Sequence, residues 1–249
     1  MKNKFIAGNW KMNNTAEDTE ALLTALIPLV KDTKNRVAVC VPYTDICLAR
    51  KLLKGTNIEL GAQNVHWADH GAFTGEISAE MLAEKGVKCV IIGHSERRGY
   101  FGETNQTVNM RLKAALAKGF TPIVCIGESL EQRQNGETED FLAQQIKEGF
   151  EGLTAEQAVR VVVAYEPIWA IGTGVTATKE QAQETIAFAR SKFAEAFGKE
   201  TAERIYFLYG GSMNEKNAKE LLGMPDIDGG LIGGASLVAE KFAKIVEAF

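Results

Sequence analysis

The stretch VVVAYEPIWAIGTGVTAT, residues 161–178, decides the fold of this chain. Its opening valines are β-branched and apolar on both faces, which is typical of a parallel strand covered on two sides. A single carboxylate, Glu166, stands where the apolar run stops, and Pro167 biases it towards an extended backbone. The glycines of the run GTG at 172–174 offer backbone amides suited to an anion. A base at the end of a strand, followed by a loop that closes and excludes water, would have this pattern.

Outward from this stretch, a short apolar run followed by an amphipathic helix repeats along the chain. We expect strands at 5–10, 37–41, 58–62, 88–93, 121–126, 160–165, 205–209 and 227–232. We expect helices near 15–30, 44–53, 104–118, 138–149, 179–197, 214–222 and 237–249. Eight such units in order predict an α/β fold with a parallel sheet, and eight is the number that closes a (β/α)8 TIM barrel. A doubly wound open sheet is the alternative that this periodicity leaves open.

Length and composition fit one globular barrel domain over residues 1–249. The chain has 45% hydrophobic and 24% charged residues, and no linker or low-complexity tract interrupts it. Its net charge of -4 argues against a nucleic-acid binder, which would show a basic stripe. No apolar run reaches about 18 residues, and the N-terminal apolar run is too short for a signal peptide, so we expect a cytoplasmic protein without a membrane span. Cys40, Cys89 and Cys125 lie in strand-like runs and are expected to be buried, reduced thiols.

A long loop from Asn64 to Glu76, NVHWADHGAFTGE, interrupts the even spacing after the third predicted strand. His66 and His70 are four residues apart, but without a helix or nearby acidic ligands this spacing does not favour a metal site. An exposed loop with this many apolar residues is expected to cover a partner surface.

Polar residues follow the predicted strands at the end where a barrel carries its chemistry. Asn9 and Lys11 follow the first strand, His94 and Glu96 the fourth, and Glu166 the sixth. Lys11 would supply positive charge for an anionic substrate. His94, at the start of a short helix, is expected to be neutral and able to donate a hydrogen bond to a carbonyl. A solvated lysine, a turn histidine and a surface ion pair of Glu96 are the structural alternatives.

Glycine pairs at 210–211 and 233–234 precede predicted helices, where bare amides and the helix dipole suit a phosphate. The run GTGVTA also fits a dinucleotide fingerprint, but its first glycine does not lie at a strand-to-helix turn, so no cofactor is expected. A base, a neutral electrophile, a cation and a phosphate cradle suit proton abstraction next to a carbonyl in a small phosphorylated sugar.

Five motifs in order give the chain a resemblance to the triosephosphate isomerase family: GNWKMN at 8–13, GHSERR at 93–98, AYEPIWAIGTG at 164–174, YGGS at 209–212 and GGAS at 233–236. The resemblance implies a (β/α)8 barrel that interconverts dihydroxyacetone phosphate and glyceraldehyde 3-phosphate without a cofactor or metal. It also implies a homodimer formed through the loop from Asn64 to Glu76. Thr74 would reach the neighbouring site, and Gln63 and Glu76 would support the contact.

The resemblance also implies a role for each site residue. Glu166 would shuttle the proton between two carbons. His94 would polarise the carbonyl and move protons between the oxygens. Lys11 and Asn9 would stabilise the enediolate oxygens, and Glu96 would support the site. The substrate phosphate would bind the backbone amides of Gly172, Ser212, Gly233 and Gly234. Ile171 and Leu231 would clamp Glu166 in an apolar setting. Tyr209 and Ser212 would hold the closed lid.

Two departures from the family pattern bear on the lid and the eighth strand. Val175 stands where many members carry lysine, and Gly230 stands where a bulkier residue is common. Two other functions are the alternatives to an isomerase. A Schiff-base aldolase with Lys11 as nucleophile would leave Glu166 unexplained, and a phosphate-binding scaffold would not need Glu166, His94 and Lys11 together.

Overall fold

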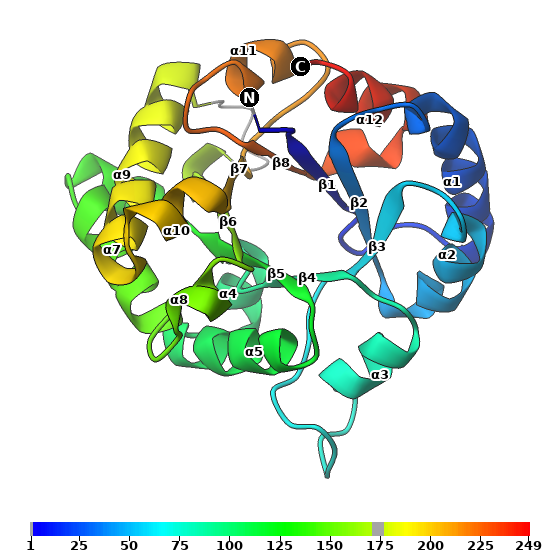
Figure 1. The fold of residues 1–249 in the computed structure, drawn as a ribbon, viewed down its shortest axis with the longest axis horizontal. Helices are drawn as coiled ribbons and strands as arrows, with labels where there is room; N and C mark the ends of the chain where they lie inside the picture. The colour runs from blue at the N-terminus through cyan, green and yellow to red at the C-terminus, as the bar shows by residue number, and fades with distance from the viewer. Residues whose placement is uncertain (1, 171–176) are drawn as a thin grey trace.

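Eight parallel strands close into a barrel in their sequence order, with β8 paired to β1 (Figure 1). The computed structural model describes residues 2–170 and 177–249. The strands are β1 (Phe5–Asn9), β2 (Arg36–Val41), β3 (Ile58–Ala62), β4 (Cys89–Ile92), β5 (Thr121–Ile126), β6 (Val162–Tyr165), β7 (Tyr206–Tyr209) and β8 (Gly229–Ile232). All eight lie within the predicted apolar runs or within one residue of them. Closure of the sheet confirms the predicted (β/α)8 barrel and excludes the alternative of a doubly wound open sheet.

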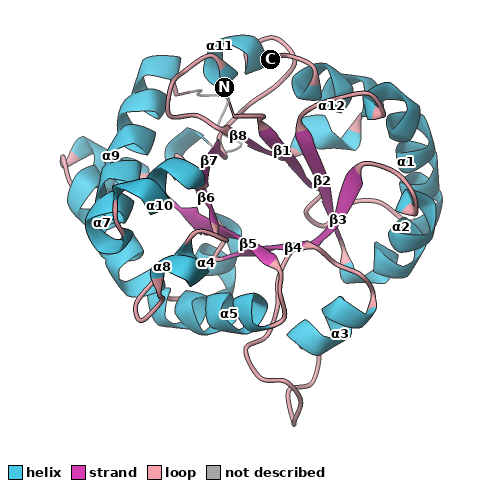
Figure 2. Cartoon of the chain, viewed as in Figure 1, coloured by secondary structure: helices cyan, strands magenta, loops and turns pink. Residues whose placement is uncertain are grey.

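Helices form a ring outside the barrel (Figure 2). In the described parts of the chain they are α1 (Ala16–Val30), α2 (Ile46–Leu53), α3 (Ala79–Glu84), α4 (Ser95–Phe101), α5 (Asn105–Ala117), α6 (Leu130–Gln134), α7 (Thr138–Gly149), α8 (Ala155–Ala158), α9 (Lys179–Phe197), α10 (Lys199–Arg204), α11 (Ala218–Leu222) and α12 (Ala239–Val246). Three short 3-10 turns, η1 (Tyr43–Asp45), η2 (Ile168–Ala170) and η3 (Gly234–Leu237), complete the connections.

Side-chain caps fix where several helices begin. Thr15, Thr104 and Thr178 each form a capping box with the residue three positions on, at the starts of α1, α5 and α9. The helix predicted near 214–222 begins only at Ala218. Asn214 and the residue three positions on bond nearby backbone amides, which competes with helical hydrogen bonds over this turn.

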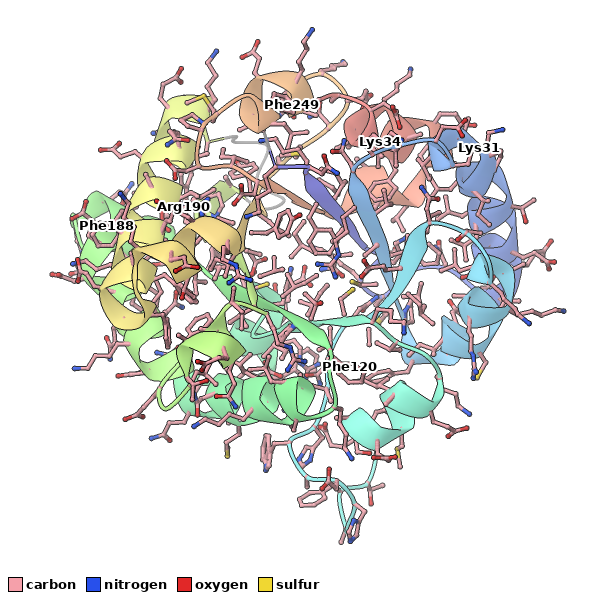
Figure 3. All side chains as sticks on the ribbon, in the orientation of Figure 1. Lys31, Lys34, Phe120, Phe188, Arg190 and Phe249 are labelled. Carbon is pink, nitrogen blue, oxygen red and sulfur yellow. The ribbon has the colours of Figure 1, made fainter. Side chains whose placement is uncertain are left out.

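The strands are apolar on both faces because the barrel has two cores. One core lies between the sheet and the helices, and a smaller one fills the barrel interior, where Figure 3 shows side chains in the space that the ribbon leaves open. Cys40, Cys89 and Cys125 lie in the interior core as free thiols with no exposed surface, which confirms their predicted burial. Cys47, on α2, is exposed.

Charged residues secure the opposite end of the barrel from the predicted site. Arg190 of α9, labelled in Figure 3, pairs with Asp226 and with Asp228 just before β8, both at 2.7 Å. These pairs join the outer ring to the start of a strand.

The loop between β3 and α3 projects from the ring (Figure 1). Within it the His66 ring lies 4.2 Å from the Trp67 ring and 4.4 Å from the Phe73 ring, measured between centroids. The Arg111 guanidinium lies 5.0 Å from the Trp67 ring centroid. The loop is therefore ordered by its own aromatic stack. No helix in the described ranges is both long and apolar enough to cross a membrane.

Candidate active site

A cavity of about 910 Å³ opens where the strands end at their carboxyl termini. Its lining brings together most of the residues expected from the sequence: Asn9, Lys11, His94, Glu96, Ser212, Leu231, Gly233 and Gly234. These residues come from β1, β4, β7 and β8 and from the loops after them. The predicted site is therefore a single place in the fold.

Lys11 has an unusual backbone. Its φ of 53° lies in the left-handed region, which non-glycine residues seldom adopt, and its amide donates to Asn9 Oδ1 at 3.1 Å. Strain of this kind persists where the surroundings enforce it and is common at functional sites. Lys11 Nζ forms an ion pair with Glu96 Oε1 at 2.6 Å, which joins these two predicted site residues.

His94 is fixed in one tautomer by its two neighbours. It is the N-cap of α4, and its Nδ1 accepts the backbone amide of Glu96 at 3.2 Å. Nε2 lies 2.8 Å from Glu166 Oε1 and carries the proton that joins them. A nitrogen that accepts an amide proton cannot also hold one, so this geometry supports the neutral imidazole.

The electrostatic surroundings of His94 act in both directions. Burial lowers its pKa, but the carboxylate of Glu166, and that of Glu96 more weakly, raise it above the ordinary value in this arrangement. The sequence led us to expect only the neutralising effect of the helix N-terminus. The added contribution comes from the contact with Glu166, and it lapses when that carboxylate moves away.

Glu166 lies just beyond β6 and is 1% exposed. Besides His94, the Ser95 amide donates to its Oε2 at 3.0 Å and the Ser95 hydroxyl to its Oε1 at 3.2 Å. Burial raises the pKa of Glu166, but His94, Ser95 and the Cys125 thiol together hold it below its ordinary value. The stronger base expected from an apolar clamp is therefore not the state seen here, because hydrogen-bond donors surround the carboxylate.

Ser95 is a site residue for which we predicted no role, and Gly210, predicted only as part of a phosphate-binding glycine pair, lies against Glu166. Ser95 binds the base directly. A Cβ at Gly210 would lie 3.0 Å from Glu166 Cγ, so glycine leaves room for the base. Each stands next to a predicted site residue at the end of a strand, and that adjacency was the available signal.

The phosphate end of the site is only partly as predicted. Gly234 begins η3, and a Cβ there would meet no atom within 4 Å, so it faces open space. Residues 210–212, by contrast, do not lead into a helix, since α11 starts at Ala218. Ser212 Oγ donates to the carbonyl of Ala170 at 3.1 Å, at the start of the predicted lid.

Some expected residues lie outside the described ranges, namely Ile171, Gly172 and Val175. Leu231 is 3% exposed, lies on β8 and lines the cavity. At Gly230 a Cβ would lie 2.8 Å from Met213 Sδ, so this methionine fills the space of the missing side chain. Tyr209 is buried, and burial raises the pKa of its hydroxyl to about 12.

A second cavity, of about 320 Å³, lies on the other side of Lys11. It shares Asn9, Lys11 and Glu96 with the first cavity and adds Met12, Gln63 and Phe101. Met12 is 96% exposed and Phe101 68% exposed. This hollow adjoins the first cavity at Lys11 and has both apolar and charged residues in its lining.

The fold and the site define an isomerase-type barrel enzyme with a buried carboxylate, a histidine and a lysine at the carboxyl ends of its strands. Residues 4–249 match the family model described as triosephosphate isomerase. The chain is 53% identical over 246 residues to the triosephosphate isomerase of Clostridium perfringens (strain SM101), covering 99% of each. It is 52% identical to that of Thermoanaerobacter sp. (strain X514), again covering 99% of each. A crystal structure of triosephosphate isomerase from Bartonella henselae superposes with a TM-score of 0.90 at 41% identity, over 99% of this chain and 98% of that one.

The chain belongs to the triosephosphate isomerase family. It is an intramolecular oxidoreductase of the aldose–ketose type. It interconverts dihydroxyacetone phosphate and D-glyceraldehyde 3-phosphate through an enediolate, a step of glycolysis and gluconeogenesis.

Proposed function

We propose that Glu166 is the base of this reaction and His94 its electrophile. The observation that carries the proposal is their direct contact of 2.8 Å at the mouth of the barrel. Glu166 takes a proton from the hydroxyl-bearing carbon of dihydroxyacetone phosphate, and the electron pair moves to form the enediolate. His94 donates its Nε2 proton to the carbonyl oxygen. His94 Nε2 then recovers a proton from the hydroxyl on the first carbon, and Glu166 returns its proton to the neighbouring carbon, which gives the aldehyde and restores both side chains.

Lys11 and Asn9 stabilise the charge that develops on the two oxygens. Lys11 is held over the cavity by its ion pair with Glu96, and Asn9 fixes the Lys11 backbone. A cation placed before the reaction starts costs no reorganisation as the enediolate forms. Glu96 therefore acts by orienting Lys11 and, through its amide, His94.

The phosphate binds at the opposite end of the cavity. Gly172, Ser212, Gly233 and Gly234 present backbone amides to it, and Leu231 forms an apolar floor under the reacting carbons. Tyr209 and Ser212 hold the lid and Ile171 covers Glu166 when substrate is bound. Support for this arrangement comes from the open face of Gly234 and the Ser212 bond to Ala170.

The carboxylate of Glu166 must leave Ser95 and His94 before it can act. Donors that stabilise the carboxylate weaken it as a base, and an apolar setting strengthens it. Substrate binding therefore raises the pKa of Glu166 from the low value of the free site.

A coupled assay tests the proposed roles. Glyceraldehyde 3-phosphate is supplied with a chelator present, and dihydroxyacetone phosphate is detected by NADH-linked reduction. Glu166→Asp retracts the carboxylate by about 1 Å and should lower kcat on the order of 100-fold. Glu139→Asp, on the outer helix α7, is the matched control and should leave kcat unchanged. A loss under threefold in Glu166→Asp would remove Glu166 as the base.

The aldolase alternative has its own test. A Schiff base on Lys11 would be trapped by borohydride in the presence of substrate, and a stable adduct at Lys11 would overturn the isomerase role of that lysine. Absence of turnover in a folded sample would favour a phosphate-binding scaffold.

We also propose that the chain is one (β/α)8 domain over residues 1–249 and acts as a homodimer through the loop from Asn64 to Glu76. Thr74 is exposed within this loop, and the hollow beside Lys11 has the exposed side chains of Met12 and Phe101 in its lining. Thr74 of a second copy would fill the hollow and support the Lys11 backbone. Gln63, which donates to the Cys40 carbonyl at 2.9 Å, forms part of its wall, and Glu76 braces the loop near Arg111.

Thr74→Arg should yield a monomer with kcat/KM about 100-fold lower, because a strained Lys11 loses its support. Sedimentation velocity and the coupled assay measure the two effects. Asn135→Arg, in the exposed turn between α6 and α7, should change neither. A fully active monomer would contradict the proposed role of the loop. Because the reaction belongs to glycolysis, we further propose a cytoplasmic location, testable by cell fractionation.

A further inference from the structure

The backbone beneath the base belongs to β5, which runs further towards the cavity than its neighbour β4. The last residue of β4, Ile92, pairs with Val124. Residues 125–128 therefore lie beyond the end of β4, and their hydrogen bonds on that side have no strand to receive them.

On its other side, this extension of β5 carries the chain of the base. The Glu166 amide donates to the Ile126 carbonyl at 2.8 Å, and the Ile168 amide donates to the Glu128 carbonyl at 3.2 Å. The parallel ladder thus continues past the end of β6. The position of the Glu166 backbone depends on where residues 126–128 lie.

Successive residues of a strand direct their amide and carbonyl groups to alternate sides. Since Ile126 and Glu128 face β6, Cys125 and Gly127 face the side that β4 leaves open. Two side chains take the place of the missing strand there. Arg98 donates to the Cys125 carbonyl at 3.3 Å, and Gln145 Oε1 accepts the Gly127 amide at 2.8 Å.

Gly127 is pressed against the peptide of the base. A Cβ at this position would lie 1.9 Å from the Glu166 carbonyl oxygen and 2.8 Å from its carbonyl carbon. A shift of Gly127 by even a fraction of an ångström therefore moves the backbone of Glu166 or opens a gap beneath it. The bond from Gln145 restrains Gly127 on the face opposite this contact.

We propose that Gln145 is a positioning residue for Glu166, acting through Gly127. Gln145 lies on α7, one layer outside the barrel, and is 3% exposed. Gln145 is not among the described residues that line the cavity. Because the Gly127 amide is buried and its strand partner is absent, losing this acceptor leaves an unsatisfied donor that can regain a bond only by moving.

The test compares three variants of the full chain in the coupled assay. Gln145→Met keeps the volume and removes the acceptor, Gln145→Glu keeps an acceptor oxygen, and Gln144→Met changes the exposed neighbour on the same helix. Gln145→Met should lower kcat about tenfold or more while KM changes less than about threefold, since a misplaced base slows the chemistry and leaves the phosphate end intact. Gln145→Glu should recover most of that loss, and Gln144→Met should match the wild type.

Two further readouts separate positioning from a general loosening of the fold. Competitive inhibition by inorganic phosphate should be unchanged in Gln145→Met, because its site lies on β7 and β8. The acid limb of kcat/KM should move to higher pH, because a displaced Glu166 loses part of its bonding to Ser95. An unchanged kcat, a phosphate affinity that falls in step with kcat, or an unmoved acid limb would each overturn the proposal.

If Gln145→Met is unfolded at the assay temperature, Gln145→Asn carries the same predictions, because it keeps the amide and withdraws it by one methylene. The inference rests on the proposed role of Glu166, so Glu166→Gln is assayed alongside. Retained turnover in Glu166→Gln would refute the role of the base. Loss of turnover there with a normal Gln145→Met would refute only the role of Gln145.

Discussion

At the scale of single residues, hydrogen bonds hold the carboxylate of Glu166, the proposed base, in one fixed position. Glu166 is almost fully buried, yet three donors from His94 and Ser95 surround its carboxylate. A buried carboxylate without such donors would tend to take up a proton. The donors favour the ionised form of Glu166, which is the form that the proposed base needs in order to accept a proton.

The variant Ser95→Ala tests whether these hydrogen bonds stabilise the Glu166 carboxylate, through the dependence of kcat/KM on pH. The hydroxyl of Ser95 stabilises the ionised form of Glu166, so its removal should raise the pKa of Glu166 and move the acid limb of kcat/KM to higher pH. The sign follows from the lowered folded-state pKa. This donor contributes stability while Glu166 is ionised, and the contribution is lost as the pH falls through that pKa.

The measurement is kcat/KM across the acid range, with thermal unfolding at two pH values. Ser95→Ala should melt below the wild type at neutral pH and approach it in acid. Ser191→Ala on α9, whose hydroxyl donates to the backbone of its own helix, is the control and should leave the acid limb in place. An acid limb that moves to lower pH in Ser95→Ala would contradict stabilisation of the Glu166 carboxylate by the Ser95 hydroxyl.

At the scale of elements, the strands could be predicted from sequence and the shorter helices could not. Strands such as β2 and β5 match the predicted runs to within one residue because burial on both faces leaves a nearly continuous apolar pattern. Helices α6 and α8 have five and four residues, too few for a hydrophobic period to emerge.

The same limit applies to the site. Residues that end strands could be found from their position in the chain, and those include Glu166, His94 and Lys11. The contact of Ser95 with the base depends on the rotation of a carboxylate, and that of Gln145 depends on β4 stopping two residues early. Neither the rotamer of Glu166 nor the relative lengths of β4 and β5 can be predicted from a local sequence pattern.

Two matched helix caps offer a prediction at this scale. Thr178 caps α9 directly after the predicted lid, and Thr104 caps α5 well away from it, each in a capping box. Thr178→Ala and Thr104→Ala should each lower the free energy of unfolding by about 1 kcal/mol. Only Thr178→Ala should also change kcat, because the start of α9 directly follows the proposed lid and would anchor it.

Chemical denaturation and the coupled assay measure these two effects. Equal changes of kcat in the two variants would show that lost stability alone explains them. An unchanged kcat in Thr178→Ala would separate the cap from lid closure.

At the scale of the whole molecule, the charge near the cavity opposes the charge of the chain. The net charge is -4, while the substrate phosphate carries about -1.5 to -2 at neutral pH. Lys216 and Lys241 line the cavity with exposed ammonium groups, and neither pairs with a carboxylate in the described ranges. Glu215 partly offsets them. The cavity therefore presents a local cationic rim on an acidic molecule.

Substrate capture should consequently depend on ionic strength. Triosephosphate isomerases approach the diffusional ceiling of kcat/KM, where attraction of a charged substrate affects the rate. Raising the ionic strength from about 10 to 150 mM should lower kcat/KM by roughly threefold and leave kcat unchanged. The double variant Lys216→Gln, Lys241→Gln should weaken this dependence.

Lys244→Gln, one turn further along α12 and away from the cavity lining, provides the control and should keep the wild-type salt dependence. Stopped-flow progress curves at several salt concentrations give the required slopes. Equal slopes for the double variant and the control would show that the rim does not attract substrate.

The buried thiols of the barrel interior also make it possible to follow unfolding of the barrel by thiol labelling. Cys40, Cys89 and Cys125 have no exposed surface, whereas Cys47 lies open on the outer ring. A thiol reagent therefore meets one reactive group while the barrel is shut and four once its strands have parted. The average number of labels per chain therefore reports the fraction of molecules whose barrel has unfolded, and no probe has to be introduced.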